Sequence, residues 1–157
     1  MPSYQPGDYT VAVDVRLTQD RLKRLDQYLT TLRKLAQVPR STLIEDAILR
    51  GSAERYLQLA IEVCLDIANH VIAAEGHRSP RDYADAFCVL TEAGILPTEF
   101  LPVAQRMARF RNRLVHLYWE VDAETVYEIL QTRLDDFDRF KGFILAHIVD
   151  QGSARAH

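Results

Sequence analysis

The residues best suited to chemistry are an arginine and a histidine that stand five positions apart, Arg111 and His116. Imidazole can take up or release a proton near neutral pH, so a histidine is a natural general acid or base. A guanidinium stays charged and can donate two parallel hydrogen bonds to phosphate oxygens. The pair therefore indicates acid–base chemistry at a phosphate ester, with Arg111 stabilising negative charge and His116 moving the proton.

The segment around this pair is cationic. Residues 101–118 contain four arginines and no acidic residue, although the formal net charge of the 157-residue chain is −3. The four are Arg106, Arg109, Arg111 and Arg113. This local charge predicts a phosphate-bearing partner, whereas the mild overall acidity argues against nonspecific coating of long nucleic acid.

Arg111, His116 and Tyr118 together resemble the R-x4-H-x-Y motif of HEPN toxins of the HepT type, which pair with MNT nucleotidyltransferases. The neighbouring Phe110, Asn112 and Leu114-Val115 resemble the same family, as does the segment 126–130. Upstream, the segments 54–70 and 82–95 are similar to the second and third helices of the family. The resemblance covers about residues 42–143, most of the chain.

The resemblance implies an all-α, HEPN-like bundle and a homodimer in which two motifs face one RNA-binding cleft. It implies a metal-independent endoribonuclease without a cofactor, acting on tRNA or mRNA, with Arg111 and His116 as catalytic residues. Asn112 would orient His116 or a phosphate. Three further arginines would bind RNA: Arg106, Arg109 and Arg113. Tyr118 would be the acceptor on which an MNT antitoxin places adenylyl groups, and this modification would block the cleft.

Other interpretations of the same residues remain open. Arg111 could be a surface arginine, His116 a hydrogen-bonded residue between helices, and Tyr118 an aromatic at the edge of the core. The alternative function is a noncatalytic helical subunit that binds a nucleotide or a substrate for a nucleotidyltransferase. An intact pair of Arg111 and His116 favours the enzyme, since a binding subunit has no need of both.

Helical geometry restricts how the pair can meet. At about 100° per residue, Asn112 and His116 share one line of a helix, while Arg111 points roughly 140° away from His116. Either the helix loosens near His116, or a second copy of the chain completes the site.

Apolar spacing predicts the elements that carry these residues, an up-and-down bundle of four to five helices. A first helix should run from Val15 to about Ala36. A second should open on a capping box of Thr42 and Glu45 and end near Gly76. The remaining expectations are a helix opened by Ser79-Pro80 and closed at Gly94, a turn at 98–100, a helix around Pro102 that carries the motif, and one final helix capped by Asp122.

One polar line remains on the long second helix, with residues spaced by four: Glu54, Gln58, Glu62, Asp66 and His70. It is either a solvated face or the border of the cleft, where an acid could pair with an arginine or orient the histidine. A metal site of Glu62, Asp66 and His70 is a weaker interpretation, because di-metal bundles use a second Glu and His pair that this sequence lacks.

The bulk properties fit one soluble domain: 48% of residues are hydrophobic and 26% charged. We expect an N-terminal arm over residues 1–14, a bundle over 15–150 and a frayed tail over 151–157. Cys64 and Cys88 lie in apolar stretches and should be reduced, buried thiols. The start of the chain lacks a signal-peptide pattern and no apolar run reaches the length of a membrane span, so a cytoplasmic location is expected.

Overall fold

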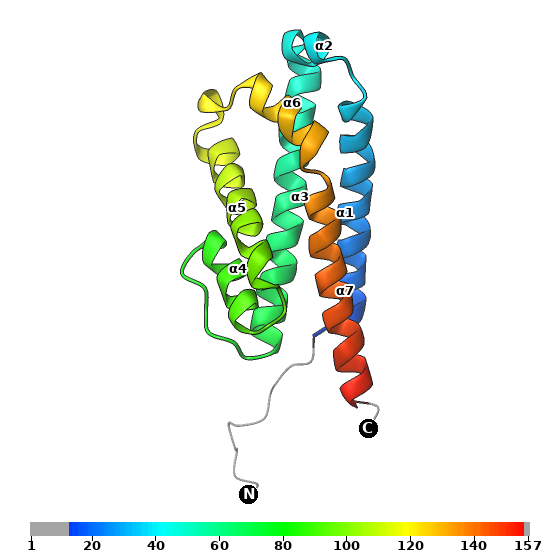
Figure 1. Cartoon of the computed structure of the whole chain (residues 1–157), viewed down its shortest axis with the longest axis vertical. Helices are drawn as coiled ribbons and strands as arrows, with labels where there is room; N and C mark the ends of the chain where they lie inside the picture. Colours follow the sequence, from blue (N-terminus) through cyan, green and yellow to red (C-terminus); the bar gives the residue numbers. More distant parts are fainter. Residues whose placement is uncertain (1–12, 156–157) are drawn as a thin grey trace, which may run out of the picture.

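The computed structural model describes residues 13–155, and the side chains of residues 13–152. The predicted arm therefore lies outside the described residues up to position 12, as do the last two residues of the predicted tail. The elements are α1 (Val15–Ala36), α2 (Arg40–Glu45), α3 (Ala47–Ala74), α4 (Tyr83–Glu92), η1 (Thr98–Phe100), α5 (Leu101–His116), η2 (Tyr118–Glu120), α6 (Ala123–Thr132) and α7 (Asp135–Arg155). The all-α bundle is confirmed (Figure 1).

Helix α3 is the centre of the bundle. It contacts α1 and α7 on one side and α4 and α5 on the other, as Figure 1 shows. The apolar stripes expected from the sequence account for this position, because Leu57, Cys64 and Ala68 are completely buried. Burial also raises the pKa of the Cys64 thiol, since the surroundings disfavour the thiolate.

Two helix starts differ from those predicted. Glu45 ends α2, and Asp46 begins the next helix with an extended backbone and a carboxylate that accepts from the amides of Ile48 and Leu49. Asp82, not Ser79, caps α4 by accepting from the amide of Asp85 at 2.8 Å. The capping box and the Ser-Pro start were therefore wrong, because in both places an aspartate further along the chain satisfies the free amides.

The final helix was also predicted wrongly as one piece. Asp122 does cap α6, accepting from the amide of Thr125, but that helix ends at Thr132 and α7 starts at Asp135. Three acidic residues in the first turn of α7 favour a new helix start, because the N-terminus of a helix attracts negative charge: Asp135, Asp136 and Asp138. Helix α7 then continues to Arg155, beyond the limit of the bundle expected at residue 150.

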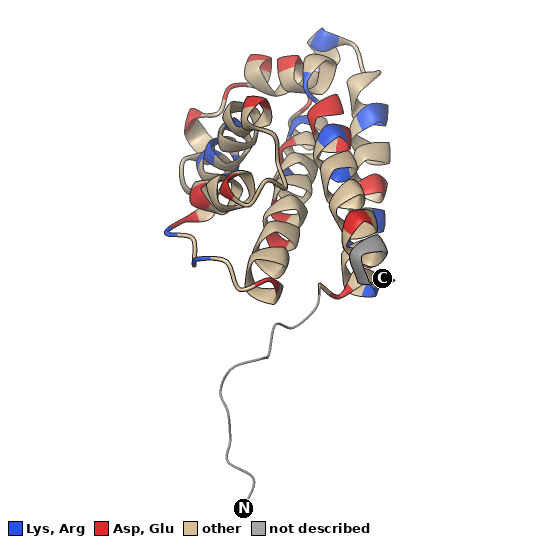
Figure 2. Ribbon diagram, turned by 60° about the horizontal axis from the view of Figure 1, so that its bottom comes forward, with Lys and Arg blue, Asp and Glu red and all other residues tan. Residues whose placement is uncertain are grey.

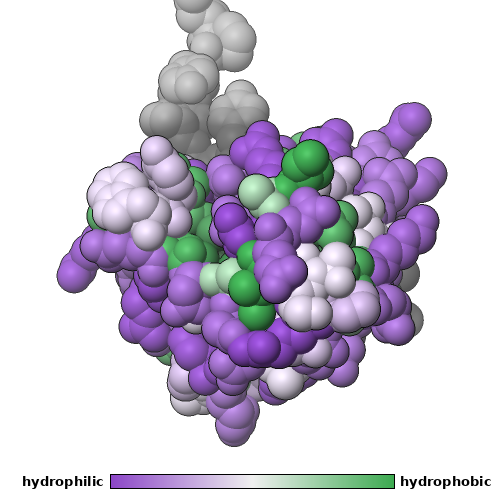
Figure 3. All heavy atoms as spheres, turned by 90° about the horizontal axis from the view of Figure 1, so that it is seen from above, coloured by the Kyte–Doolittle hydropathy of each residue, from purple (hydrophilic) through white to green (hydrophobic). Residues whose placement is uncertain are grey.

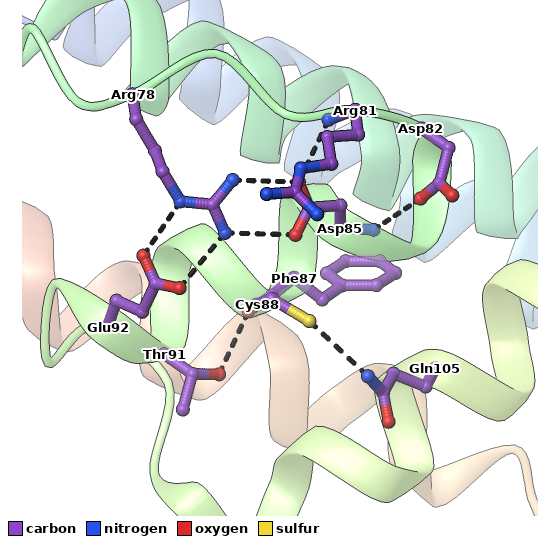
Figure 4. Close-up of polar contacts among 9 residues, drawn as sticks. All are labelled: Arg78, Arg81, Asp82, Asp85, Phe87, Cys88, Thr91, Glu92 and Gln105. Atoms are coloured by element: carbon purple, nitrogen blue, oxygen red, sulfur yellow. Dashed lines mark hydrogen bonds and ion pairs between the residues drawn. The ribbon is translucent and has the colours of Figure 1, made fainter.

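Charged contacts fix the connection between α3 and α4. The guanidinium of Arg78 in this connection donates to both oxygens of Asp85 and both oxygens of Glu92, at 2.8–2.9 Å (Figure 4). These bonds hold the pKa of Asp85 well below its usual range and also lower the pKa of Glu92. Figure 4 also shows Cys88 of α4 accepting from Gln105 of α5, so α4 is tied both to its own loop and to its neighbour.

Among the described residues one helix, α3, is long and apolar enough to cross a membrane, so the expectation that no apolar run reaches that length was wrong. Its most apolar window is 61% buried inside the bundle, as expected for the central helix of a folded domain. Around it, basic and acidic residues are interspersed along most of the ribbon in Figure 2.

Candidate functional site

The motif lies at the C-terminal end of α5, where the helix stops at His116. Pro102 stands in the first turn of this helix, as predicted. Leu117 leaves helical geometry with φ −135° and ψ 39°, and its amide donates to the carbonyl of Arg113. The chain therefore loosens after His116, not between Arg111 and His116, so the angular separation expected between these two side chains persists.

Arg111 points toward α3 and α4 and is 13% exposed. Its Nε and Nη2 lie 3.2 and 3.1 Å from Oε1 of Glu62, and its Nη1 donates to Oδ1 of Asn112 at 3.2 Å. The guanidinium carbon lies 4.4 Å from the centre of the Tyr83 ring, a cation–π distance. Two N–H groups of the arginine thus donate hydrogen bonds, to Glu62 and to Asn112, and its Nη2 lies at ion-pair distance from the same Glu62 oxygen.

His116 is exposed at the end of α5. The structure brings Asn112 to Arg111 through their hydrogen bond, although Asn112 and His116 share one line of the helix. Among the described residues, no hydrogen bond or ion pair joins Arg111 to His116. In a single chain, the two principal candidates therefore occupy different faces of α5.

Tyr118 follows in η2 and is 64% exposed. Its ring meets that of Trp119 edge to face, with centroids 5.3 Å apart, and Trp119 is equally exposed. The turn is fixed by Arg113, which donates to the carbonyl oxygen of Glu120 at 3.2 Å. Figure 3, which views the molecule from above, shows apolar residues exposed among hydrophilic ones at this end of the bundle.

The three arginines expected to bind RNA share one pocket of about 410 Å³ between α3, α5, α6 and α7. Arg106, Arg109 and Arg113 line it from α5, and Arg133 lines it from the end of α6. By the same helical angles, His116 lies about 20° from the line of Arg109 and about 60° from that of Arg113. Arg109 and Arg113 of the pocket therefore lie on the same side of α5 as His116, which does not itself line the pocket, and Arg111 lies on another side.

The polar line on α3 divides into residues with different roles. Glu62 pairs with Arg111, so at this residue the alternative of an acid that contacts an arginine holds, not that of a solvated face. Gln58 supports the pair by donating to Glu62 at 3.0 Å. His70 instead accepts from the amide of Asp14 and fixes the start of α1. Within the described residues, no group of three histidine, cysteine or acidic side chains could hold a metal.

Three residues near the site were not singled out from the sequence. The ring of Tyr83 lies against Arg111, and Arg133 is the fourth arginine of the pocket. Trp119 meets the ring of Tyr118 edge to face. Tyr83 and Arg133 could not be found by spacing, because each meets α5 only through the packing of another helix. Trp119 did carry a signal, since it is the only tryptophan in the chain and follows the motif directly.

Comparisons with known proteins place this arrangement in a family. The family described as "Ribonuclease HepT-like" matches residues 21–144. The mRNA nuclease HepT of Shewanella oneidensis is 30% identical over 102 residues, which cover 65% of this chain and 77% of that protein. The tRNA nuclease HepT of Aphanizomenon flos-aquae is 24% identical over 135 residues, covering 85% of this chain and 90% of the relative.

A solved structure of similar fold is that of the tri-AMPylated Shewanella oneidensis HEPN toxin in complex with an MNT antitoxin. It superposes with a TM-score of 0.77 at 25% identity and covers 82% of this chain and 96% of that one. The family match spans α3, α5 and η2, which supply Glu62 and the R-x4-H-x-Y residues. The chain therefore belongs to the HepT-like ribonuclease family.

Proposed function

We propose that this protein is the toxin of a toxin–antitoxin pair and cleaves RNA in the cytoplasm without a metal ion. The observation that carries the proposal is the position of Arg111: its guanidinium is held by Glu62 on the central helix and still has N–H groups with no hydrogen-bond partner among the described residues, which could donate to a phosphate. The family match and the nuclease names of the relatives support the same reaction.

The reaction uses a nucleophile that RNA itself supplies, the 2′-hydroxyl beside the scissile phosphate. His116 takes the hydroxyl proton, the 2′-oxygen attacks phosphorus, and the bond to the 5′-oxygen breaks as that oxygen receives a proton. The products are a 2′,3′-cyclic phosphate and a free 5′-hydroxyl. Arg111 stabilises the charge that grows on the phosphate oxygens in the transition state.

A twofold homodimer completes this site. Because Arg111 and His116 diverge within one chain, the histidine of one protomer and the arginine of its partner would meet at the same phosphate. The partner copy of His116 then serves as the second acid or base. Asn112 fixes the orientation of Arg111 through the bond that joins them.

An MNT nucleotidyltransferase is the proposed antitoxin, and Tyr118 is its proposed target. The exposure of Tyr118 supports this, because a transferase must reach the phenol oxygen. An adenylyl group there would add negative charge and bulk beside His116 and compete with RNA phosphate. Mass spectrometry after coexpression with the antitoxin and ATP should find the added mass on Tyr118 and none in a Tyr118→Phe variant.

The test of the proposed reaction is RNA cleavage by purified variants. Arg111→Ala and His116→Ala should each lower the rate at least about 100-fold, the scale of a lost acid–base group or charge-stabilising donor. Arg24→Ala on α1 is the matched control, because Arg24 is exposed and outside the site. Full activity in either of the first two variants would overturn the proposal and favour the noncatalytic binding subunit.

A further inference from the structure

The pocket between α3, α5, α6 and α7 has two contrasting parts. Its floor is apolar: Leu57 and Ile61 come from α3 and Phe137 from α7, and all three are at most 3% exposed. Its mouth carries Arg106, Arg109 and Arg113, which are exposed, and Arg133, which is half-buried. An apolar floor beneath a cationic rim suits a ligand with a flat apolar part and a phosphate.

The charge balance of the pocket favours an anion. Four guanidinium groups face two carboxylates, Glu128 and Asp136, and Asp136 is already 3.5 Å from Arg139. Within the described residues, Arg106, Arg109 and Arg133 have no hydrogen-bond or ion-pair partner. Only Arg113 is engaged, at the carbonyl of Glu120. Most of the rim is therefore available to bind phosphate oxygens.

The rim also leads toward the catalytic histidine. Arg109 and Arg113 lie near the line of His116 on α5, about 10 and 5 Å before it along the helix axis. A backbone whose phosphates followed these two arginines would reach His116 within a few nucleotides.

We propose that this pocket holds one unpaired nucleotide of the RNA substrate, with its base on the apolar floor and its flanking phosphates on the arginine rim. The inference rests on the proposed ribonuclease function and names a binding site outside the reacting centre. A base can enter the pocket and reach its apolar floor only after it leaves the stack of its neighbours. The pocket therefore makes the enzyme select single-stranded segments near the cut. Ile129 of α6 also lines the pocket, and it and Arg133 become specificity residues.

Binding and cleavage together test this proposal. Fluorescence anisotropy measures the binding of a labelled single-stranded RNA, and of a series of RNAs that each lack one base, to the His116→Ala protein. This variant is used because it leaves the RNA uncut. The same RNAs are cut by the wild-type protein. Removal of one particular base should weaken binding and raise KM roughly 5- to 100-fold, the scale of one stacked base, while removal of bases elsewhere has little effect.

Two pocket variants sharpen the result. Ile129→Trp fills the pocket, so it should weaken binding of intact RNA by the same factor and abolish the difference between intact and abasic RNA. Arg133→Gln should raise KM with kcat unchanged and reduce the salt dependence of binding. Arg24→Gln, an exposed arginine on α1, is the matched control. If Ile129→Trp fails to fold, the abasic series and Arg133→Gln still decide the question.

Each outcome has a distinct meaning. Pocket-dependent binding without cleavage by the wild type would overturn the ribonuclease and leave the binding site standing. Cleavage that is indifferent to the abasic series and to both variants would overturn the pocket alone, and absence of RNA binding would overturn both. Free nucleoside monophosphates could also compete with RNA for binding in a way that depends on Ile129. If they do so and the abasic series has no effect, the pocket holds a free nucleotide. If Ile129→Trp loses the dimer and the abasic RNAs are cleaved as well as the intact RNA, the pocket is an interface between two copies of the chain.

Discussion

At Arg111, four neighbours act on one guanidinium: Glu62, Asn112, Tyr83 and, through Glu62, Gln58. The pair with Glu62 is shielded from solvent on the arginine side, so its geometry is better defined than that of an exposed ion pair. The carboxylate neutralises part of the charge of the arginine, but it also removes the freedom of a long side chain to turn away from the substrate.

Replacing Glu62 with glutamine tests this positioning role. Glu62→Gln should lower kcat about tenfold, the effect of weakening one hydrogen bond between charged groups by roughly 1.5 kcal/mol. KM should change little, because no contact with RNA is lost. Glu54→Gln, on the same polar line but two turns away, is the matched control for removal of a carboxylate. Unchanged kcat in Glu62→Gln would mean that Arg111 needs no such support.

At the scale of the elements, helix α4 is positioned by charge as much as by packing. Arg78 joins Asp85 and Glu92, and Asp82 caps the helix (Figure 4). The next residue, Tyr83, lies against Arg111. The hydrogen bonds from Arg78 lower the pKa of both acids. Their ionised forms are therefore favoured in the folded protein.

This linkage predicts how stability depends on pH. A carboxyl whose pKa is lower in the folded state contributes stability above its unfolded pKa, about 4, and loses that contribution as the pH falls through the folded value. Arg78→Gln should therefore lower the urea midpoint at pH 7, and its difference from the wild type should shrink progressively below pH 4. Unfolding curves at pH 7, 4 and 3 measure this, with Arg24→Gln as the control. A difference that is constant with pH would rule out the linkage.

Most of the helices could be predicted from the sequence, whereas the starts of α3 and α4 and the break after Thr132 could not. The apolar line of the last segment runs through Val126, Leu134 and Ile148, and all three are buried. The break after Thr132 leaves that line intact, which is why spacing alone could not reveal it. Several polar residues could cap each helix start, and tertiary contacts decide between them: Asp82 prevails over Ser79 where Arg78 and the amide of Arg81 hold the loop on Asp85.

The residues of the candidate site come from the sequence, and their contacts come from the structure. Arg111, His116 and Tyr118 belong to one motif, and of the polar line on α3 it is Glu62 that pairs with Arg111. Their separation also followed from helical angles. The support from Tyr83 and the convergence of Arg133 with three arginines of α5 depend on which helices become neighbours, and no local pattern encodes that.

At the scale of the whole molecule, Arg111 and His116 lie on different sides of α5. The proposed chemistry therefore requires a second copy of the chain. Arg111 faces α3 and α4, whereas His116 is exposed on the side of the arginine pocket. A twofold axis near the end of α5 would give each phosphate an arginine from one protomer and a histidine from the other.

Complementation between inactive variants tests that assembly. Arg111→Ala and His116→Ala, coexpressed with different affinity tags and purified as the mixed species, should recover part of the RNA cleavage that each variant lacks alone, at a rate below that of the wild type because the second histidine is missing. The reason is that a mixed dimer retains one arginine and one histidine in the shared cleft. Sedimentation should give twice the mass of one chain. A pure monomer, or mixed species without activity, would contradict the composite site.

The buried thiol of Cys64 can report when the bundle opens, because it becomes accessible only then. An alkylating reagent is attacked by a thiolate only where it can reach the sulfur. Cys64 is fully buried on α3, as expected from the sequence, whereas Cys88 is only half-buried, so the expectation of burial was wrong for that residue. Alkylation should therefore proceed in two phases, a quicker one as α4 detaches and a much slower one limited by exposure of the central helix. A ligand that stabilises the folded bundle, such as RNA or an antitoxin, would slow the second phase. The measurement needs no added label.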